Sequence, residues 1–157
     1  MRISRIYLPL DAETIELDVL VAGEKAHYIR NVLRLKVGQE LNFFIPAGTE
    51  YRSKVATISK HEVTLSVIEA LNDSAPASSL DTTLVQGISS SDRMDYSIQK
   101  AAELGCRRLI PVFSDFCSVK IAEHKRAKKL QHWQAVAIGA SEQSGRGDIM
   151  QVEAIQT

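Results

Sequence analysis

The sequence has few cysteines, no net charge and no long apolar run. Its only cysteines are Cys106 and Cys117; these are too few for a disulfide scaffold and lack the close partners of a zinc site. No segment approaches the roughly 18 consecutive apolar residues of a membrane-spanning helix. The N-terminal segment MRISRIYLPL is interrupted by arginine, unlike a signal peptide. These absences predict a cytoplasmic protein without a membrane partner.

Common catalytic signatures are missing as well. The four histidines show no metal-ligand spacing such as HExxH, and GxSxG, GxGxxG and Walker patterns do not occur. We therefore expect no bound metal and disfavour a hydrolase. Lys plus Arg total 19, as do Asp plus Glu, so the bulk charge indicates no polyanionic partner. Any binding of nucleic acid must use local patches of charge.

The first half of the chain alternates apolar and polar residues in short stretches typical of strands. We expect strands at residues 3–8, 15–21, 41–45, 51–58 and 62–68. Between the second and third, Ala26, Ile29, Val32 and Leu33 recur at helical spacing, which predicts a helix from Gly23 to Gly38. Five short strands with one helix predict a small barrel or a rolled sheet.

A polar segment then separates this half from the next. Residues 72–79, NDSAPASS, contain no large apolar side chain and are rich in turn-forming residues. We therefore expect a first domain at residues 1–72, a linker at 73–79 and a second domain at 80–157.

The second half follows a different pattern, in which strands alternate with helices. Strands are expected at residues 82–86 and 109–113, and a strand start at 152–155. The intervening helix is expected to begin with Ser91 or Asp92 as its cap and to end at Gly105, with one apolar stripe made of Met94, Ile98, Ala101 and Ala102. A second helix spans about residues 124–143. This order predicts parallel pairing and half of an α/β domain, so the fold class is α+β overall.

Polar residues on and before the first of these helices allow two interpretations. The turn Gly87–Asp92, GISSSD, would lie at the carboxyl edge of a parallel sheet, where open α/β folds bind ligands. It could equally be an ordinary serine-rich turn. Gln99, Lys100 and Glu103 lie off the apolar stripe, and their spacing favours a solvated surface over catalysis.

The segment Ser141–Arg146, SEQSGR, ends the second helix in a cluster of polar groups. Arg146 directly follows Gly145, and its guanidinium could donate two hydrogen bonds to a phosphate or a carboxylate. The alternative is a helix C-cap with a cation near the negative end of the helix dipole.

Two groups of cations stand out despite the zero net charge. Arg30 and Arg34 are spaced for one helix face, with Lys36 at its end, and could bind RNA phosphates or form a solvated basic face. A denser run begins the second long helix and could likewise be a solvated helix start or an RNA contact; its members are Lys120, Lys125, Arg126, Lys128 and Lys129.

Several of these segments, in this order, resemble the bacterial 16S rRNA uracil N-3 methyltransferases of the SPOUT (trefoil-knot) class. The matching stretches cover essentially the whole chain and are RIYL (5–8), VLRLKVGQEL (32–41), DRMDYSIQKAAELG (92–105), IPVFSD (110–115) and WQAVAIGASEQSGR (133–146). The resemblance implies an N-terminal PUA-like RNA-binding β-barrel followed by a SPOUT-type α/β domain.

The resemblance also implies a reaction. S-adenosylmethionine would donate a methyl group to N-3 of a uridine in 16S rRNA of the small ribosomal subunit, and the enzyme would act as a homodimer with its site at the subunit interface. Glu142, Gln143 and Arg146 would lie at the edge of the active site. Of the cations singled out by their spacing, Arg30, Arg34 and Lys36 are the RNA-binding residues that we predict.

The sequence departs from this family in several places. The family's cofactor-binding segments, a GPEGG-like loop and an LGxRILRxETA-like helix, do not occur in this sequence. We therefore expect a truncated chain whose α/β domain is incomplete and lacks the C-terminal knot, and which does not hold the cofactor by itself. A non-catalytic RNA-binding or dimerisation module is the alternative. Ser90 and Phe116 replace common basic residues, and Met150 replaces a usual proline.

Overall fold

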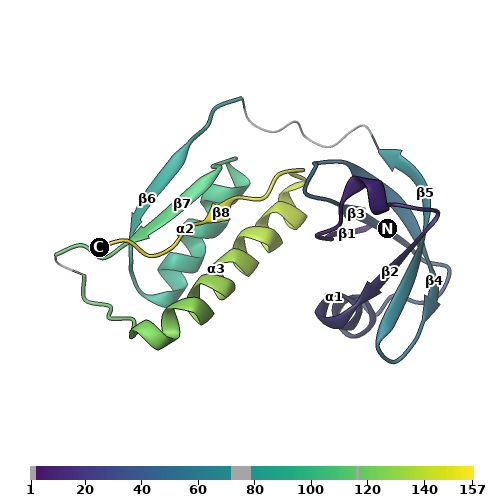
Figure 1. Ribbon diagram of the computed structural model, residues 1–157, viewed down its shortest axis with the longest axis horizontal. Coiled ribbons are helices and arrows are strands. Elements are labelled where there is room, and N and C mark those ends of the chain that lie inside the picture. Colours follow the sequence, from purple (N-terminus) through teal and green to yellow (C-terminus); the bar gives the residue numbers. More distant parts are fainter. Residues whose placement is uncertain (1–2, 72–78, 116) are drawn as a thin grey trace. The chain divides into compact units, whose positions relative to one another are not determined.

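The computed structural model describes residues 3–71, 79–115 and 117–157 (Figure 1). It divides into two compact units, residues 1–75 and 76–157. The predicted linker, residues 73–79, and Phe116 lie outside the described residues, apart from Ser79.

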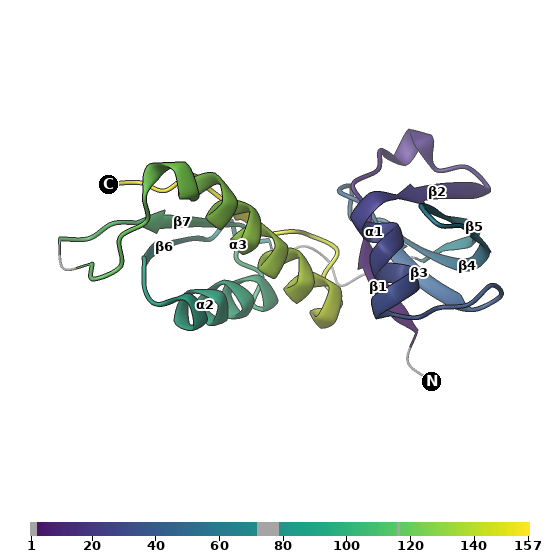
Figure 2. The same cartoon turned by 90° about the horizontal axis from the view of Figure 1, so that it is seen from below.

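The first unit is a five-stranded sheet in the order β1-β3-β4-β5-β2. Its strands are β1 Ser4–Tyr7, β2 Asp18–Ala22, β3 Glu40–Phe44, β4 Glu50–Ile58 and β5 Glu62–Leu71. The pair β1–β3 is parallel and the other pairs are antiparallel. The sheet is rolled around one core (Figure 2). The prediction of a strand from residue 15 was wrong at its start, because Ala12–Thr14 form a 3-10 helix before β2.

Alternation along the strands explains why this sheet buries one face. Ile6, Leu41, Phe43, Val55 and Leu65 are at most 1% exposed and share one core. Fully burying an aliphatic or aromatic side chain of this size contributes roughly 1.5–3 kcal/mol relative to leaving it in water. The residues between them on the strands point to the other face, which is polar apart from the contact between Phe44 and Tyr7.

The helix predicted from Gly23 to Gly38 is shorter and irregular. The α-helix α1 spans Gly23–His27 and continues as a π-helical turn over Tyr28–Val32. Leu33 donates its amide to the Tyr28 carbonyl, one residue further back than in an α-helix. Arg34 then adopts a left-handed conformation with φ 53°, which ends the helix. Val32, which belongs to the predicted helical pattern, is 58% exposed.

The second unit is a parallel three-stranded sheet, in the order β6-β7-β8, with two crossover helices. Its elements are β6 Thr83–Gly87, α2 Ser91–Glu103, β7 Arg108–Val112, α3 Glu123–Ser144 and β8 Gln151–Val152. This confirms the predicted order of strands and helices. The last strand covers residues 151–152 and not 152–155.

Both helices pack on the same face of this sheet. The predicted stripe of α2 is buried, as are Trp133, Ala137 and Ala140 of α3, and they share one core with Leu109 of β7. The side-chain amide of Gln134 attaches α3 to β8: its Nε2 donates to the Met150 carbonyl and its Oε1 accepts from the Val152 amide, both at 2.9 Å. On the opposite face Val85 is 61% exposed.

The topology places the two ends of the helices at opposite edges of the sheet. Since α2 follows β6 and α3 follows β7, both helices start at the carboxyl edge and run side by side (Figure 1). Lys129 Nζ donates to Ser91 Oγ at 2.6 Å, which joins the two helix starts. The predicted caps were wrong: Ser90 is the N-cap of α2 and makes no side-chain cap bond.

Candidate functional site

The segment Ser141–Arg146 closes the turn between α3 and β8. Gly145 adopts φ 80° and ends α3 in a left-handed conformation, which a residue with a Cβ rarely adopts. Ser141 is buried and its Oγ donates to the Asp148 carbonyl at 2.9 Å. Glu142 is also buried, at 9% exposure, whereas Gln143 is exposed. Of the two predicted alternatives, the helix C-cap describes the backbone here.

The guanidinium of Arg146 is held by a carboxylate and by the closing turn of α2. Its Nε and Nη2 donate to the two carboxylate oxygens of Asp148 at 2.9 and 3.2 Å, and its side chain is only 15% exposed. It also lies against Gly105: a Cβ at that glycine would come within 2.7 Å of Nη2. The end of DRMDYSIQKAAELG and the end of WQAVAIGASEQSGR therefore meet in space, at the amino edge of the sheet.

The serine-rich turn after β6 lies at the other, carboxyl edge. Ile88 is buried, while Ser90 and Ser91 are exposed at the start of α2. Lys129 reaches this turn through Ser91. The structure thus separates the two motifs that the sequence singled out, with Ser91 at one end of the layer and Arg146 at the other.

The basic patch of the first unit is only partly as predicted. Arg30 and Arg34 do not share a helix face, because Arg34 follows the end of the π-helical turn. Arg30 Nη1 donates to the carbonyls of Ser59 (3.0 Å) and Lys60, so this guanidinium fastens the helical turn to the β4–β5 hairpin. Arg34 and Lys36 are exposed and make no ion pair within the described residues.

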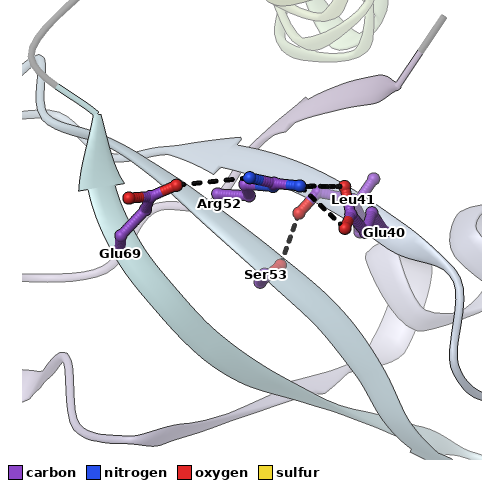
Figure 3. Close-up of polar contacts among 5 residues, drawn as sticks. All are labelled: Glu40, Leu41, Arg52, Ser53 and Glu69. Atoms are coloured by element: carbon purple, nitrogen blue, oxygen red, sulfur yellow. Dashed lines mark hydrogen bonds and ion pairs between the residues drawn. The ribbon is translucent and has the colours of Figure 1, made fainter.

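On the outer face of the rolled sheet, two arginines are matched by carboxylates. Arg52 on β4 donates to Glu40 on β3 at 2.9 and 3.1 Å and to Glu69 on β5 at 3.3 Å (Figure 3). Its hydrogen bond with Glu40 raises the pKa of the guanidinium further above its ordinary value. Ser53, on the other side of β4, donates its hydroxyl to the Leu41 carbonyl.

A second, more buried pair lies beside it. Arg5 Nε donates to Glu50 Oε2 at 2.7 Å, with side chains 11% and 10% exposed, and the guanidinium carbon sits 3.9 Å from the centroid of the Phe44 ring. Asn42 Nδ2 donates to the other oxygen of Glu50 at 3.0 Å. Burial raises the pKa of the nearby Tyr7 phenol. These pairs neutralise the sheet face and hold its strands together.

The described residues contain no cluster of three histidine, cysteine or carboxylate side chains able to hold a metal ion. Cys106 and Cys117 are free thiols whose Sγ atoms donate to backbone carbonyls. Within the described helices, none is long and apolar enough to cross a lipid bilayer.

A site for S-adenosylmethionine can be tested against the carboxyl edge of the sheet. The donor has a sulfonium cation, which needs carboxylates or dipoles around it and a cavity for the nucleoside. The described residues at this edge are serine hydroxyls, the α3 cations Arg126 and Lys129 and three carboxylates, Asp92, Asp115 and Glu123; Gly87 is the single glycine of the turn after β6. Carboxylates that could face a sulfonium are therefore present at this edge, whereas the glycine-rich loop that the family resemblance implies does not occur in the sequence.

Sequence reasoning missed two residues of these arrangements. Asp148 was not singled out, although it is the carboxylate that fixes Arg146. Gln134 was not singled out either, although its amide attaches α3 to β8. An acidic residue two positions after an arginine in a tight turn is a usable signal for the first; the partners of Gln134 are 16 and 18 residues away, and no local pattern indicates them.

Comparison with protein families matches both units. The RNA methyltransferase domain family matches residues 76–157, and the RNA methyltransferase PUA domain family matches residues 21–68. Curated relatives include ribosomal RNA small subunit methyltransferase E of Bacillus subtilis, 30% identical over 84% of this chain and 51% of the relative. The protein of the same name from Buchnera aphidicola is 29% identical over 97% of this chain and 61% of the relative. The chain thus spans about half to three fifths of their length.

Solved structures agree with this assignment. Ribosomal RNA small subunit methyltransferase E from Neisseria gonorrhoeae, bound to S-adenosylmethionine, is 31% identical with a TM-score of 0.88 over 99% of this chain and 63% of that one. A methyltransferase from Legionella pneumophila in complex with the same cofactor has the same identity and TM-score over 100% of this chain and 64% of that one. The expectation of a PUA domain followed by a SPOUT-like methyltransferase domain is confirmed. The chain therefore belongs to the RNA methyltransferase family that includes ribosomal RNA small subunit methyltransferase E.

Proposed function

We propose that this protein methylates N-3 of a uridine in small-subunit rRNA, with S-adenosylmethionine as the methyl donor. The observation that supports this best is the pair of family matches in one order, PUA domain first and methyltransferase domain second. The relatives named for rRNA methylation align with up to 97% of the chain. The choice of N-3 rests on the resemblance of the motifs at residues 92–105 and 133–146.

The proposed reaction sets a requirement on the site. N-3 of uracil bears a proton and is a poor nucleophile until that proton leaves, so the site must orient the base and stabilise its anion. We propose Glu142, Gln143 and Arg146 as the edge of this site. The fixed guanidinium of Arg146, held by Asp148 and Gly105, supports a role as a preorganised positive charge. S-adenosylmethionine would supply the methyl group.

The RNA would also contact the PUA unit. We propose that Arg34 and Lys36 bind phosphates, while Arg30 positions the turn that presents them by its bonds to Ser59 and Lys60. The small ribosomal subunit is the proposed partner, a homodimer the proposed assembly, and the cytoplasm the proposed location.

The alternative is a non-catalytic RNA-binding or dimerisation module. The two segments by which the family resemblance implies donor binding, a GPEGG-like loop and an LGxRILRxETA-like helix, do not occur in the sequence. We therefore expect this 157-residue chain to bind S-adenosylmethionine more weakly than about 10 μM, that is, with a binding free energy smaller than about 7 kcal/mol. Isothermal titration calorimetry measures this, and a tighter dissociation constant would contradict the expectation.

The function itself is tested by nucleoside analysis. Deletion of the gene that encodes this chain should remove 3-methyluridine from 16S rRNA, as measured by mass spectrometry of digested rRNA, and the intact gene should restore it. The variant Arg146→Lys keeps the positive charge but loses the forked pair of hydrogen-bond donors. A gene that encodes it should therefore restore less 3-methyluridine than the intact gene. Unchanged 3-methyluridine in the deletion strain would contradict the proposed function.

A further inference from the structure

The start of α3 concentrates cations that have no carboxylate partner in the part of the chain that the structure describes. Four of the five residues from Lys125 to Lys129 are basic. Lys125, Lys128 and Lys129 are spaced by three and four residues and form one side of the helix, which we call the α3 basic face; Arg126 flanks it on the buried side.

Two of these cations are exposed, and the other two contact neutral groups of the protein. Lys125 and Lys128 are exposed and form no ion pair within the described residues. Lys129 donates to the neutral hydroxyl of Ser91 and lies 5.9 Å from the Trp133 ring centroid. The Arg126 guanidinium lies 5.4 Å from the Phe113 ring centroid, and its buried Nε has no hydrogen-bond partner among the described residues.

Helix stability does not explain this concentration of charge. The N-terminal end of a helix has a partial positive charge, so cations in the first turns are unfavourable there. Glu123 is the acidic residue of that turn, and α3 has no side-chain cap at Ala122. Nearby on α2, Asp92 is exposed and Asp95 pairs with His132 at 2.8 Å. These carboxylates leave Lys125 and Lys128 uncompensated.

The α3 basic face lies at the edge of the sheet where a ligand would be expected to bind. The starts of α2 and α3 both lie at the carboxyl edge of the parallel sheet, where open α/β folds bind ligands. Because both helices start here, the backbone amides of their first turns point to this edge. Neither helix has a side-chain cap bond to these amides. The exposed hydroxyl-bearing residues Ser90 and Ser91 adjoin it.

We propose that the α3 basic face binds phosphates of the RNA substrate, as a contact surface of the methyltransferase unit in addition to that of the PUA unit. This rests on the proposed function, because an RNA substrate supplies the closely spaced phosphates that match three cations within about one and a half turns of a helix. The face contributes affinity through phosphates and does not read the sequence.

The test is filter binding of labelled 16S rRNA by the full 157-residue chain between about 50 and 200 mM KCl, the range in which phosphate contacts change affinity most. The double variant Lys125→Gln/Lys128→Gln removes two uncompensated charges. The matched control, Lys100→Gln/Arg108→Gln, removes two charges of the same unit that pair with Glu103 and Asp81. Urea unfolding of each variant checks that the fold is intact.

We expect the slope of log K against log salt to become shallower by about 1.5 for Lys125→Gln/Lys128→Gln, two contacts at roughly 0.7–0.9 each. The control should change the slope by less than half of that. Equal slopes for wild type and Lys125→Gln/Lys128→Gln, or an equal change in the control, would overturn this proposal and leave the proposed function standing.

Two further results separate the explanations. If the wild-type chain does not retain 16S rRNA at all, its role in RNA binding fails together with this proposal. Polyglutamate at an equal concentration of charge should not displace the rRNA. If it displaces rRNA as well from wild type as unlabelled rRNA does, the face binds an acidic protein and the RNA proposal is wrong.

Discussion

Arginines on the outer face of the rolled sheet are paired with carboxylates, whereas lysines at the start of α3 form no ion pair within the described residues. On the sheet, Arg5 lies on Glu50, and Arg52 lies between Glu40 and Glu69. On α3, Lys125 and Lys128 project into solvent and form no ion pair within the described part of the chain. The chain as a whole has equal numbers of acidic and basic residues, so composition alone hides this difference.

The comparison shows that pairing, and not the count of charges, distinguishes structural cations from candidate RNA contacts. A buried arginine with a carboxylate partner cross-links strands, and its charge is neutralised where it stands. An exposed lysine without a partner contributes little to folding but can release counterions when it meets a phosphate. Arg146 is also a paired cation, because Asp148 fixes its guanidinium. The motif that contains Arg146 is nevertheless expected at the edge of the active site.

The largest expected effect comes from breaking the buried pair. Glu50→Gln leaves the Arg5 guanidinium 11% exposed beside a neutral amide, and the loss of one partner of a buried pair costs about 3 kcal/mol of the free energy of unfolding. Urea denaturation monitored by circular dichroism measures it. Glu62→Gln, an exposed position on β5, is the matched control and should stay within about 0.5 kcal/mol of wild type. A urea midpoint of Glu50→Gln equal to that of wild type would show that this pair does not stabilise the fold.

The next effect tests whether Arg146 is held as the geometry indicates. Gly105→Ala forces a left-handed backbone, with φ 86°, onto a residue with a Cβ and puts that Cβ within 2.7 Å of the guanidinium. We expect a loss of about 1–3 kcal/mol. Gly139→Ala, inside α3, would place its Cβ where no atom lies within 4 Å, and should instead gain roughly 0.5–1 kcal/mol. Thermal unfolding of both variants gives the comparison, and equal stabilities would contradict it.

A smaller effect separates Arg30 from its neighbours. Arg30→Ala removes the bonds to Ser59 and Lys60 and should cost about 1–2 kcal/mol of folding free energy. Arg34→Gln/Lys36→Gln should leave stability within about 0.5 kcal/mol of wild type and flatten the salt dependence of rRNA binding by roughly 1.5. Filter binding and urea unfolding measure the two effects. An unchanged salt slope would exclude Arg34 and Lys36 as phosphate contacts.

The smallest effect concerns an exposed pair. The hydrogen bond from Lys100 lowers the pKa of Glu103, with a second bond from Gln99. A carboxyl with a lowered pKa contributes stability above its unfolded pKa, and this contribution is lost as the pH falls through its folded pKa. Because the pair is exposed, Glu103→Gln should shift the urea midpoint barely at neutral pH and not at all in strong acid, below the folded pKa. A clear loss at neutral pH would show that exposed pairs are also structural.

Local patterns were sufficient to predict the second unit. The stripe from Met94 to Ala102 and the small or aromatic residues of α3 have the spacing of buried helix faces, and the structure buries them. The strands alternate with these helices, so parallel pairing follows from topology. The order of elements was therefore visible in the sequence.

Features that depend on contacts distant in sequence were not predictable. The helix from Gly23 was expected to continue to Gly38, but it widens at Tyr28–Val32 and is held there by the hairpin carbonyls bonded to Arg30. The contact between Gly105 and Arg146 joins residues on either side of β7 and α3. The catalytic roles of Glu142 and Gln143 stay predictions, because their surroundings alone do not define a reaction.

Lysine footprinting tests the central claim most directly. The chain is acetylated with and without bound 16S rRNA, and mass spectrometry measures the modification of each lysine. We predict that Lys36, Lys125 and Lys128 are protected by RNA, whereas Lys100, paired with Glu103, reacts equally in both states. Equal reactivity of Lys125 and Lys128 with and without rRNA, under conditions where the RNA is bound, would contradict the claim.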